Sequence, residues 1–312
     1  NLNRFARRGL HFRRAYTQST HSDYADMCIV SSLYPLRSTS HHYYRASDPW
    51  SKTLIYDVLK PLGFATANIS SSNETWGGMD QFLASPNLDL YYDAERSRAP
   101  TRLDERDIGF ANEVRSGAMR RGSLDDAHTV DRAISWIREQ TAAGRRFFLN
   151  MSFQNSHFSY ALPPDRPRPF QPGEIDFDAS FARFPRDKTP IVRNAYYNAI
   201  HDCDQQLGRF IQALEACDQL DKTILVVMGE NGEAFYENGI VCHAGLPREP
   251  ALRVGLVIHA PALANPATID YPTELVDVVP TVFGLLGWKS HPNFQGLDVL
   301  ADDRPDLRDR LL

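Results

Sequence analysis

The sequence predicts an α/β protein with a mostly parallel central sheet and helices on both of its faces. Apolar runs of strand length alternate along the chain with segments whose apolar residues recur at helical spacing. Strands that alternate with helices imply crossover connections, which make neighbouring strands parallel. The runs FFLNMSF and TILVVM are apolar on successive residues, as expected for strands of a sheet covered on both faces.

The predicted elements follow in order along the chain. Helical periodicity opens it at Leu2, Phe5 and Ala6. The later pattern predicts, in sequence, a helix (53–60), a strand (64–69), a helix (125–140), a strand (147–153), a long helix ending near 216, a strand (223–228), a strand at LRVGLVIHAP and a helix at ELVDVVPTVFGLLGW. Segments 84–124 and 161–188 are rich in proline, arginine and aspartate and predict loops.

Composition narrows the range of functions. The 312 residues are enough for one large α/β domain, and we expect a single catalytic domain over 1–312. The net charge of -5 gives no case for nucleic-acid binding, and the sequence has no run of about 18 apolar residues to span a membrane. The four cysteines lack metal-site spacing, which favours buried free thiols.

Oxygen-bearing side chains follow directly on the strand predicted over 223–228. Glu230 and Asn231 lie between Gly229 and Gly232. Ligands in such sheets bind beyond the carboxyl ends of the strands, and a neighbouring carboxylate and amide supply the hard oxygen ligands that Mg²⁺ or Ca²⁺ prefers. The alternative is a polar glycine turn with solvated side chains.

Two histidines and one tryptophan are candidates for contacting substrate. His157 follows the strand predicted over 147–153, and His243 lies in the segment CHAGLPREP. Each histidine is either a hydrogen-bonded loop residue or a cationic, proton-donating contact to an anionic substrate. Trp76, in SSNETWGGM, either stacks on a substrate group or is a half-buried packing residue.

The stretch QSTHSDYADMCIVSSLYPLRS combines hydroxyl groups with the start of a helix. The apolar spacing predicts a helix from Asp23 to Leu33, with Ser22 as its N-cap. A serine is common there for stability alone. The N–H groups and dipole of a helix N-terminus also favour an alkoxide or a phosphate oxygen, so a hydroxyl of this stretch is a candidate nucleophile, but the stretch alone does not choose among Ser19, Thr20 and Ser22.

The order of these motifs resembles the alkaline phosphatase and sulfatase superfamily, and within it the lipoteichoic acid synthases and related phosphotransferases and hydrolases. NLNRFARRGLHFRRAYTQS is similar to the family opening PNLDRLAxxGxxFxNAYx, FFLNMSFQNSHFSY to PFFLxxxxxNHFPY, and VVMGENGEAFYENG to VVxGDHGExFxEHG. The segments HAGLPREPALRVGLVIHAP and ELVDVVPTVFGLLG likewise resemble HGxxLYEEExRVPLIIxAP and xxVDIxPTLLxLLG. The resemblance covers nearly the whole chain.

The resemblance assigns roles to the candidate residues. In sulfatases a proline lies thirteen residues after the nucleophile, and counting back from Pro35 gives Ser22, the place of the synthases' threonine nucleophile, which leaves Thr20 as the fallback. The motifs imply that Trp76, His157 and His243 contact substrate, that either histidine protonates the leaving group, and that Ser22, Glu230 and Asn231 hold a divalent metal ion such as Mn, Mg or Ca.

Three departures from the family pattern change the expected chemistry. The family's Asp-His metal pair is Glu230-Asn231 here. Its first metal-ligating acid, which belongs to a first strand, lies upstream of NLNRF, so we expect a domain truncated at both ends. No Cys/Ser-x-Pro-x-Arg signature begins at Ser22, so we expect plain serine and no formylglycine.

The resemblance therefore implies a metal-dependent phosphoester transferase or hydrolase that forms a phosphoseryl intermediate at Ser22. A sulfuric ester hydrolase and a catalytically inactive binding protein are the alternatives. The expected partner is a small-molecule or lipid-linked phosphoester or sulfate ester, and the sequence leaves the oligomeric state open. The synthases further imply an extracytoplasmic, membrane-associated protein with an anchor upstream of residue 1.

Overall fold

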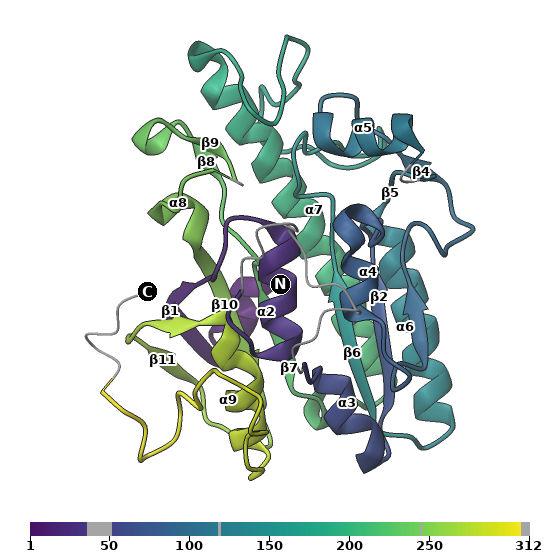
Figure 1. The fold of residues 1–312 in the computed structure, drawn as a ribbon, viewed down its shortest axis with the longest axis vertical. Helices are drawn as coiled ribbons and strands as arrows, with labels where there is room; N and C mark the ends of the chain where they lie inside the picture. The colour runs from purple at the N-terminus through teal and green to yellow at the C-terminus, as the bar shows by residue number, and fades with distance from the viewer. Residues whose placement is uncertain (36–51, 118–119, 244, 307–312) are drawn as a thin grey trace.

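The computed structural model describes residues 1–35, 52–117, 120–243 and 245–306 (Figure 1). Within them, one sheet has the strand order β11-β1-β10-β7, with β12 also paired to β1. Its strands are β1 (Leu10–Tyr16), β7 (Leu225–Met228), β10 (Arg253–His259), β11 (Ala267–Ile269) and β12 (Thr273–Glu274). A second sheet has the order β3-β2-β6 and consists of β2 (Ala65–Ser70), β3 (Leu90–Tyr92) and β6 (Phe147–Ser152).

Helices cover both faces of the first sheet, as the alternation along β10 shows. Leu256 and Ile258 of β10 are buried in one core cluster with residues of α2 (Ser22–Ser31) and α9 (Val278–Leu285). Val257, between them, is buried on the opposite face against α1 (Leu2–Ala6) and α7 (Thr189–Ala216). Successive strand residues point to opposite faces, so this strand has an apolar layer on either side.

The second sheet packs on α6 (Asp126–Ala142), which also runs beside α7 (Figure 1). Ala65, Ala67 and Ile69 of β2 are buried against Val130, Ala133, Trp136 and Ile137 of α6. The remaining elements are α3 (Ile55–Leu59), α4 (Met79–Leu83), β4 (Thr101–Arg102), α5 (Ile108–Ser116), β5 (Ser123–Leu124), β8 (Ala234–Phe235), β9 (Val241–Cys242) and α8 (Glu249–Leu252).

The α/β class predicted from the sequence is confirmed, and most predicted helices and strands lie within a few residues of the observed ones. The strands β2, β3 and β6 are parallel, whereas β10 runs antiparallel to both β1 and β7. Antiparallel neighbours need no helical crossover, so the helix–strand rhythm of the sequence does not reveal them. The helix α5 lies in a segment that the sequence predicted to be a loop.

A cavity of about 1560 Å³ separates the two sheets. Every residue from Phe147 to Gln154 and from Thr223 to Glu233 lines it. A strand presents only alternate residues to each face, so a lining of consecutive residues shows that the cavity runs along the edges of β6 and β7. Accordingly, both apolar strands are only half-buried, and in the described sheets each pairs on one side only.

No helix in the described part of the chain combines the length and apolar character needed to cross a membrane.

Candidate active site

Ser22 and Glu230 meet where α2 begins and β7 ends. The Ser22 hydroxyl donates a hydrogen bond to Glu230 Oε1 at 2.6 Å. The sequence analysis made Ser22 the N-cap, but the helix begins with Ser22 itself, and the extended residue before it, His21, is the N-cap. The shift leaves Ser22 in the first turn, where the helix dipole still favours negative charge on its oxygen.

A cluster of carboxyl groups surrounds this pair. Asp26, one turn along α2, makes a side-chain hydrogen bond with Glu230, and burial together with that neighbouring acid raises the pKa of Asp26 well above its usual range. Burial likewise raises the pKa of Asp23 and of Glu74 to about 7, and the charge of Glu230 adds to both shifts. Buried acids with raised pKa values mark a place where a cation or added protons would relieve repulsion.

His157 and His243 lie next to each other, with ring centroids 5.0 Å apart. His157 Nδ1 is 2.8 Å from the Phe158 carbonyl oxygen and 3.5 Å from Asp107 Oδ2. The Phe181 ring stacks on His157 at 5.6 Å and meets His243 edge-on at 4.7 Å. The aromatic ring and the hydrogen bonds restrict both imidazoles to narrow ranges of orientation.

A carboxylate orients His243 from behind. His243 Nδ1 is 2.8 Å from Glu233 Oε2, and the Tyr160 hydroxyl donates to the other oxygen of Glu233 at 2.8 Å. Burial alone favours the neutral imidazole, but the adjacent Glu233 outweighs it, so the pKa of His243 is raised. His243 therefore keeps its positive charge to higher pH than an exposed histidine, with Nδ1 engaged and Nε2 left for another partner.

The oxygen atoms of Ser22, Glu230 and Asn231 are chemically suited to a divalent cation. Asn231 donates through Nδ2 to the Gly232 carbonyl, while its buried Oδ1 has no hydrogen-bond partner. Hard cations accept oxygen ligands of these kinds. The described residues contain no group of three or more histidine, cysteine or acidic side chains arranged to hold a metal ion. The serine, carboxylate and amide set thus fits a divalent ion in part, as oxygen atoms that could serve as three of its ligands.

Most predicted site residues share one region. His157, Glu230, Asn231 and His243 all line the cavity beside β6 and β7, and so does Asp26, which the sequence analysis did not predict. Ser22, Thr20 and Trp76 are not part of that lining, although Ser22 is hydrogen-bonded to Glu230, which is. The Thr20 hydroxyl is buried and donates to the Gly245 carbonyl at 3.1 Å, which makes it a poor nucleophile. Half-buried Trp76 packs against the main core, so its substrate contact stays a prediction.

Comparison with known proteins assigns the chain to a protein family. The family model described as Sulfatase matches residues 1–288. The chain belongs to the sulfatase family. This sulfatase-family chain is 21% identical to arylsulfatase K of Homo sapiens over 333 positions, which cover 96% of the chain and 60% of that protein. Arylsulfatase of Clostridium perfringens is 23% identical over 206 positions, covering 58% and 42%. The chain thus spans about 60% of the curated relatives that it matches over most of its length.

Solved structures confirm the alkaline phosphatase and sulfatase fold. The lipoteichoic acid synthase LtaP of Listeria monocytogenes has a TM-score of 0.68 and 21% identity, covering 96% of this sulfatase-family chain and 68% of LtaP. The phosphonate monoester hydrolase of Agrobacterium radiobacter has a TM-score of 0.68 and 16% identity, covering 98% and 71%. At these identities the likeness concerns the fold alone.

The sequence analysis missed several residues of the site in this sulfatase-family chain. Asp26 follows Ser22 by four positions, one helical turn, so the predicted helix was enough to place it near the nucleophile. Asp107, Tyr160 and Glu233 had no such signal, because only the tertiary fold brings them to the two histidines.

Proposed function

We propose that the protein is a metal-dependent phosphoester hydrolase or transferase in which Ser22 is the nucleophile. The observation that carries the proposal is the hydrogen bond from Ser22 to Glu230 at the start of a helix, beside two oriented histidines. Family membership and the named relatives support chemistry on a sulfate or phosphate ester. The expected substrate is a small-molecule or lipid-linked ester, handled by an extracytoplasmic domain.

The proposed reaction has two displacements. Ser22 Oγ attacks phosphorus, its proton passes to Glu230, and the bond from phosphorus to the leaving alcohol breaks. His243 or His157 gives a proton to the departing oxygen. Water, or an acceptor alcohol in a transferase, then attacks the phosphoseryl group, and Ser22 recovers a proton as the product leaves.

Ser22, Glu230 and Asn231 would hold the divalent ion. When bound, such an ion lowers the pKa of an attached hydroxyl and neutralises charge on phosphoryl oxygens. The N-terminal N–H groups of α2 favour negative charge at the same place. His243, whose pKa the adjacent Glu233 raises, would add positive charge when protonated.

A sulfuric ester hydrolase is the second candidate, favoured by the family model and the arylsulfatase relatives. The sequence after Ser22 is Asp-Tyr-Ala-Asp and lacks the Pro-x-Arg that accompanies formylglycine formation. A sulfate ester on a plain serine is stable, because serine lacks the route by which a formylglycine hydrate releases the bound sulfate. The local sequence therefore favours phosphoesters.

The decisive experiment compares substrates on the full-length protein. Purified protein is assayed with bis(p-nitrophenyl) phosphate, p-nitrophenyl phosphate and p-nitrophenyl sulfate, with and without added Mn²⁺. We expect phosphodiester turnover and, in an acid-quenched sample, mass-spectrometric detection of phosphate on the peptide that contains Ser22. Ser22→Ala should abolish both signals, whereas Ser22→Thr, which keeps a hydroxyl, should retain part of the activity.

Sulfate turnover that survives Ser22→Ala contradicts the nucleophile assignment. A full-length protein with neither bound ion nor activity on any ester supports an inactive, ligand-binding family member. Ser19→Ala is the matched control, because Ser19 lies in the same loop and accepts a hydrogen bond from the His21 amide. Its activity should stay within about twofold of wild type, since surface substitutions outside the site have small effects.

The domain itself extends, we further propose, to a strand N-terminal to residue 1 that fills the cavity between β6 and β7. Within the described residues each of these strands pairs on one side only, and a cavity of that volume is far larger than packed cores tolerate. Asn1 and Leu2 line the same cavity. Amide hydrogen exchange tests this: β6 and β7 should be strongly protected in full-length protein and weakly in residues 1–312. Equal protection in both contradicts it.

A further inference from the structure

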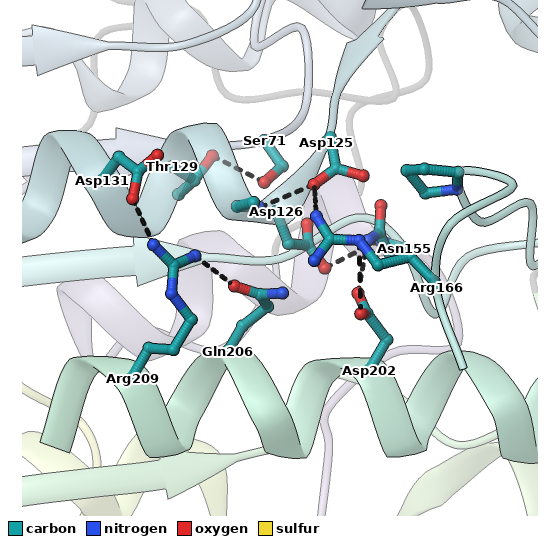
Figure 2. A network of polar contacts seen from close by, with 12 residues as sticks. Ser71, Asp125, Asp126, Thr129, Asp131, Asn155, Arg166, Asp202, Gln206 and Arg209 are labelled. Atoms are coloured by element: carbon teal, nitrogen blue, oxygen red, sulfur yellow. Dashed lines mark hydrogen bonds and ion pairs between the residues drawn. The ribbon is translucent and has the colours of Figure 1, made fainter. Parts of the chain in front are cut away.

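A network of polar side chains lies between α6 and α7 (Figure 2). Its centre is Asp126, the first residue of α6, whose side chain is inaccessible to solvent. Asp126 Oδ1 accepts a hydrogen bond from the Gln154 amide at 2.8 Å, and Oδ2 accepts one from the Asn155 amide at 3.1 Å. The carboxylate therefore holds the backbone amides of two consecutive residues shortly after β6.

Asn155 extends the network in two directions. Its Nδ2 donates to Asp202 of α7 at 2.9 Å, and its Oδ1 accepts from Arg102 of β4 at 2.6 Å. Asn155 and Asp202 are each about 1% exposed. Arg166 bridges Asp125 at 2.9 Å and Asp202 at 3.7 Å, as Figure 2 shows. Hydrogen bonds and ion pairs thus connect four segments to the turn after β6, namely α6, α7, β4 and the segment that contains Arg166.

The network connects directly to His157. The residues held by Asp126 begin a turn in which the His157 amide donates to the Gln154 carbonyl at 3.0 Å. The next turn follows at once, since the Tyr160 amide donates to the His157 carbonyl at 2.7 Å. A displacement of Gln154 would therefore move the His157 imidazole.

We infer that Asp126 and Asn155 are positioning residues, a buried clamp that sets where His157 stands relative to His243 and Ser22. The inference deepens the proposed function, on which its catalytic consequence rests. Burying an ionised carboxylate costs free energy, and burial raises the pKa of Asp126 to about 6. Asp126 is buried despite this unfavourable free energy, and both of its oxygens accept hydrogen bonds from one turn of the candidate site. This arrangement is expected of a group that supports an active site rather than of a residue that stabilises the core.

Asp126→Asn tests the clamp with almost no change in side-chain volume. The amide keeps one acceptor oxygen but turns an N–H donor toward the second backbone amide, so one of the two hydrogen bonds becomes a donor–donor conflict. The matched control is Asp131→Asn on the same helix, where an exposed carboxylate pairs with Arg209 of α7. Each variant removes one carboxylate of α6 and one of its contacts, which is with the turn after β6 for Asp126 and with α7 for Asp131.

The first readout is independent of activity. In full-length protein labelled on histidine, the imidazole NMR signals of His157 should move in Asp126→Asn, while those of His128, on α6 itself, should stay in place. Asp131→Asn should leave both unchanged. If the signals of His157 are the same in all three proteins, the clamp does not position it and the inference is overturned.

The second readout is kinetic and uses the phosphodiester assay. Displacing a catalytic group by about 1 Å can cost about 100-fold, so kcat of Asp126→Asn should fall about 10- to 100-fold with KM changed much less. Asp131→Asn should keep kcat within about twofold. Absence of turnover in wild type would count against the proposed function alone, because the NMR result still decides the clamp.

A measurement on wild type covers the case in which Asp126→Asn does not fold. The amides of Gln154 and Asn155 are held by a fully buried acceptor, so they should exchange with deuterium about 100-fold more slowly than the amides of the exposed Asp165 and Gln171. Exchange of the two amides at the rate of those exposed positions overturns the inference.

Discussion

The hydroxyl of Ser22 donates to the carboxylate of Glu230 at 2.6 Å, although 208 positions separate the two residues in the sequence. One comes from the first turn of α2 and the other from the residues just after β7. The contact joins a candidate nucleophile to a candidate metal ligand. It also makes Glu230 the residue whose replacement has the most specific consequences.

Glu230→Gln should weaken the binding of a divalent ion and slow the reaction. The change removes a negatively charged oxygen ligand. It also replaces one of the two carboxylate oxygens that can accept the hydrogen bond from Ser22 with an amide NH₂ group, which cannot accept it. We expect Mn²⁺ affinity, measured by calorimetry on full-length protein, to fall at least about tenfold. EDTA treatment should abolish wild-type activity, and added Mn²⁺ should restore it.

The control for this substitution is Glu237→Gln, which removes an exposed carboxylate, paired with Arg193, from the same segment. Its Mn²⁺ affinity should match that of wild type. Equal affinities in wild type and Glu230→Gln would exclude Glu230 from the metal site.

Leaving-group dependence should distinguish the roles of the two histidines. A general acid matters most when the departing alcohol is a poor leaving group. Replacing the general acid with glutamine should slow an alkyl phosphodiester by about 100-fold and a p-nitrophenyl diester by much less. We expect His243→Gln to behave in this way, because Glu233 raises the pKa of His243 and so favours the protonated imidazole that a general acid needs.

His157→Gln serves as the comparison, since its effect should be similar for both esters if the residue only contacts the phosphoryl group. Equal losses on the two substrates for both variants would exclude a general-acid role for either histidine.

The stability of the protein should depend on pH through Asp126. Burial raises the pKa of Asp126 from 3.8 to about 6, so the folded state binds the proton more tightly than the unfolded state. This stabilising contribution is complete below about pH 4 and is lost as pH rises to about 6, by about 3 kcal/mol at most.

Urea unfolding from pH 3.5 to 7.5 checks this prediction. The stability of wild type relative to Asp126→Asn should fall across the acidic range and then level off. The exposed Asp131→Asn, paired only at the surface, should show a much smaller trend. A constant difference between wild type and Asp126→Asn would mean that burial does not shift this carboxyl.

Gly232→Ala should disrupt the site through the backbone. A Cβ at Gly232 would lie 2.1 Å from the Pro250 carbonyl oxygen and 2.9 Å from that of Arg253. Relief requires the chain after Asn231 to move. We expect a loss of about 1–3 kcal/mol in unfolding free energy, seen as a lower melting temperature, and a large loss of activity. Gly239→Ala tests an open position in the same segment, although its positive φ adds local strain. Normal activity in Gly232→Ala would show that this backbone tolerates displacement.

Local patterns in the sequence predicted much of the fold and part of the site. Periodicity located α6, α7, β6 and β7 because each is long or strongly apolar. The helix α5 was missed, since it lies in a segment without strong periodicity. The antiparallel course of β10 was missed because strand direction depends on partners distant in the chain.

The residues of the candidate site also fall into two groups, those that local sequence identified and those that only tertiary contacts reveal. Glu230, Asn231 and His157 follow apolar strands, and Ser22 begins a helix, so local sequence identified them. Asp107, Asp126 and Glu233 act through contacts with residues from other segments. No spacing in the sequence reports such a contact, which explains why the supporting acids emerge only from the structure.

The open edges of β6 and β7 have a consequence for handling the protein. In the described sheets each of these apolar strands has a neighbour on one side only, and an unpaired strand edge is a template for any extended chain that reaches it. Residues 1–312 produced alone should therefore self-associate as their concentration rises, and a charged substitution on either edge should improve their solubility. Light scattering of residues 1–312 beside the full-length protein would show how much of any precipitation depends on the exposed edges of β6 and β7.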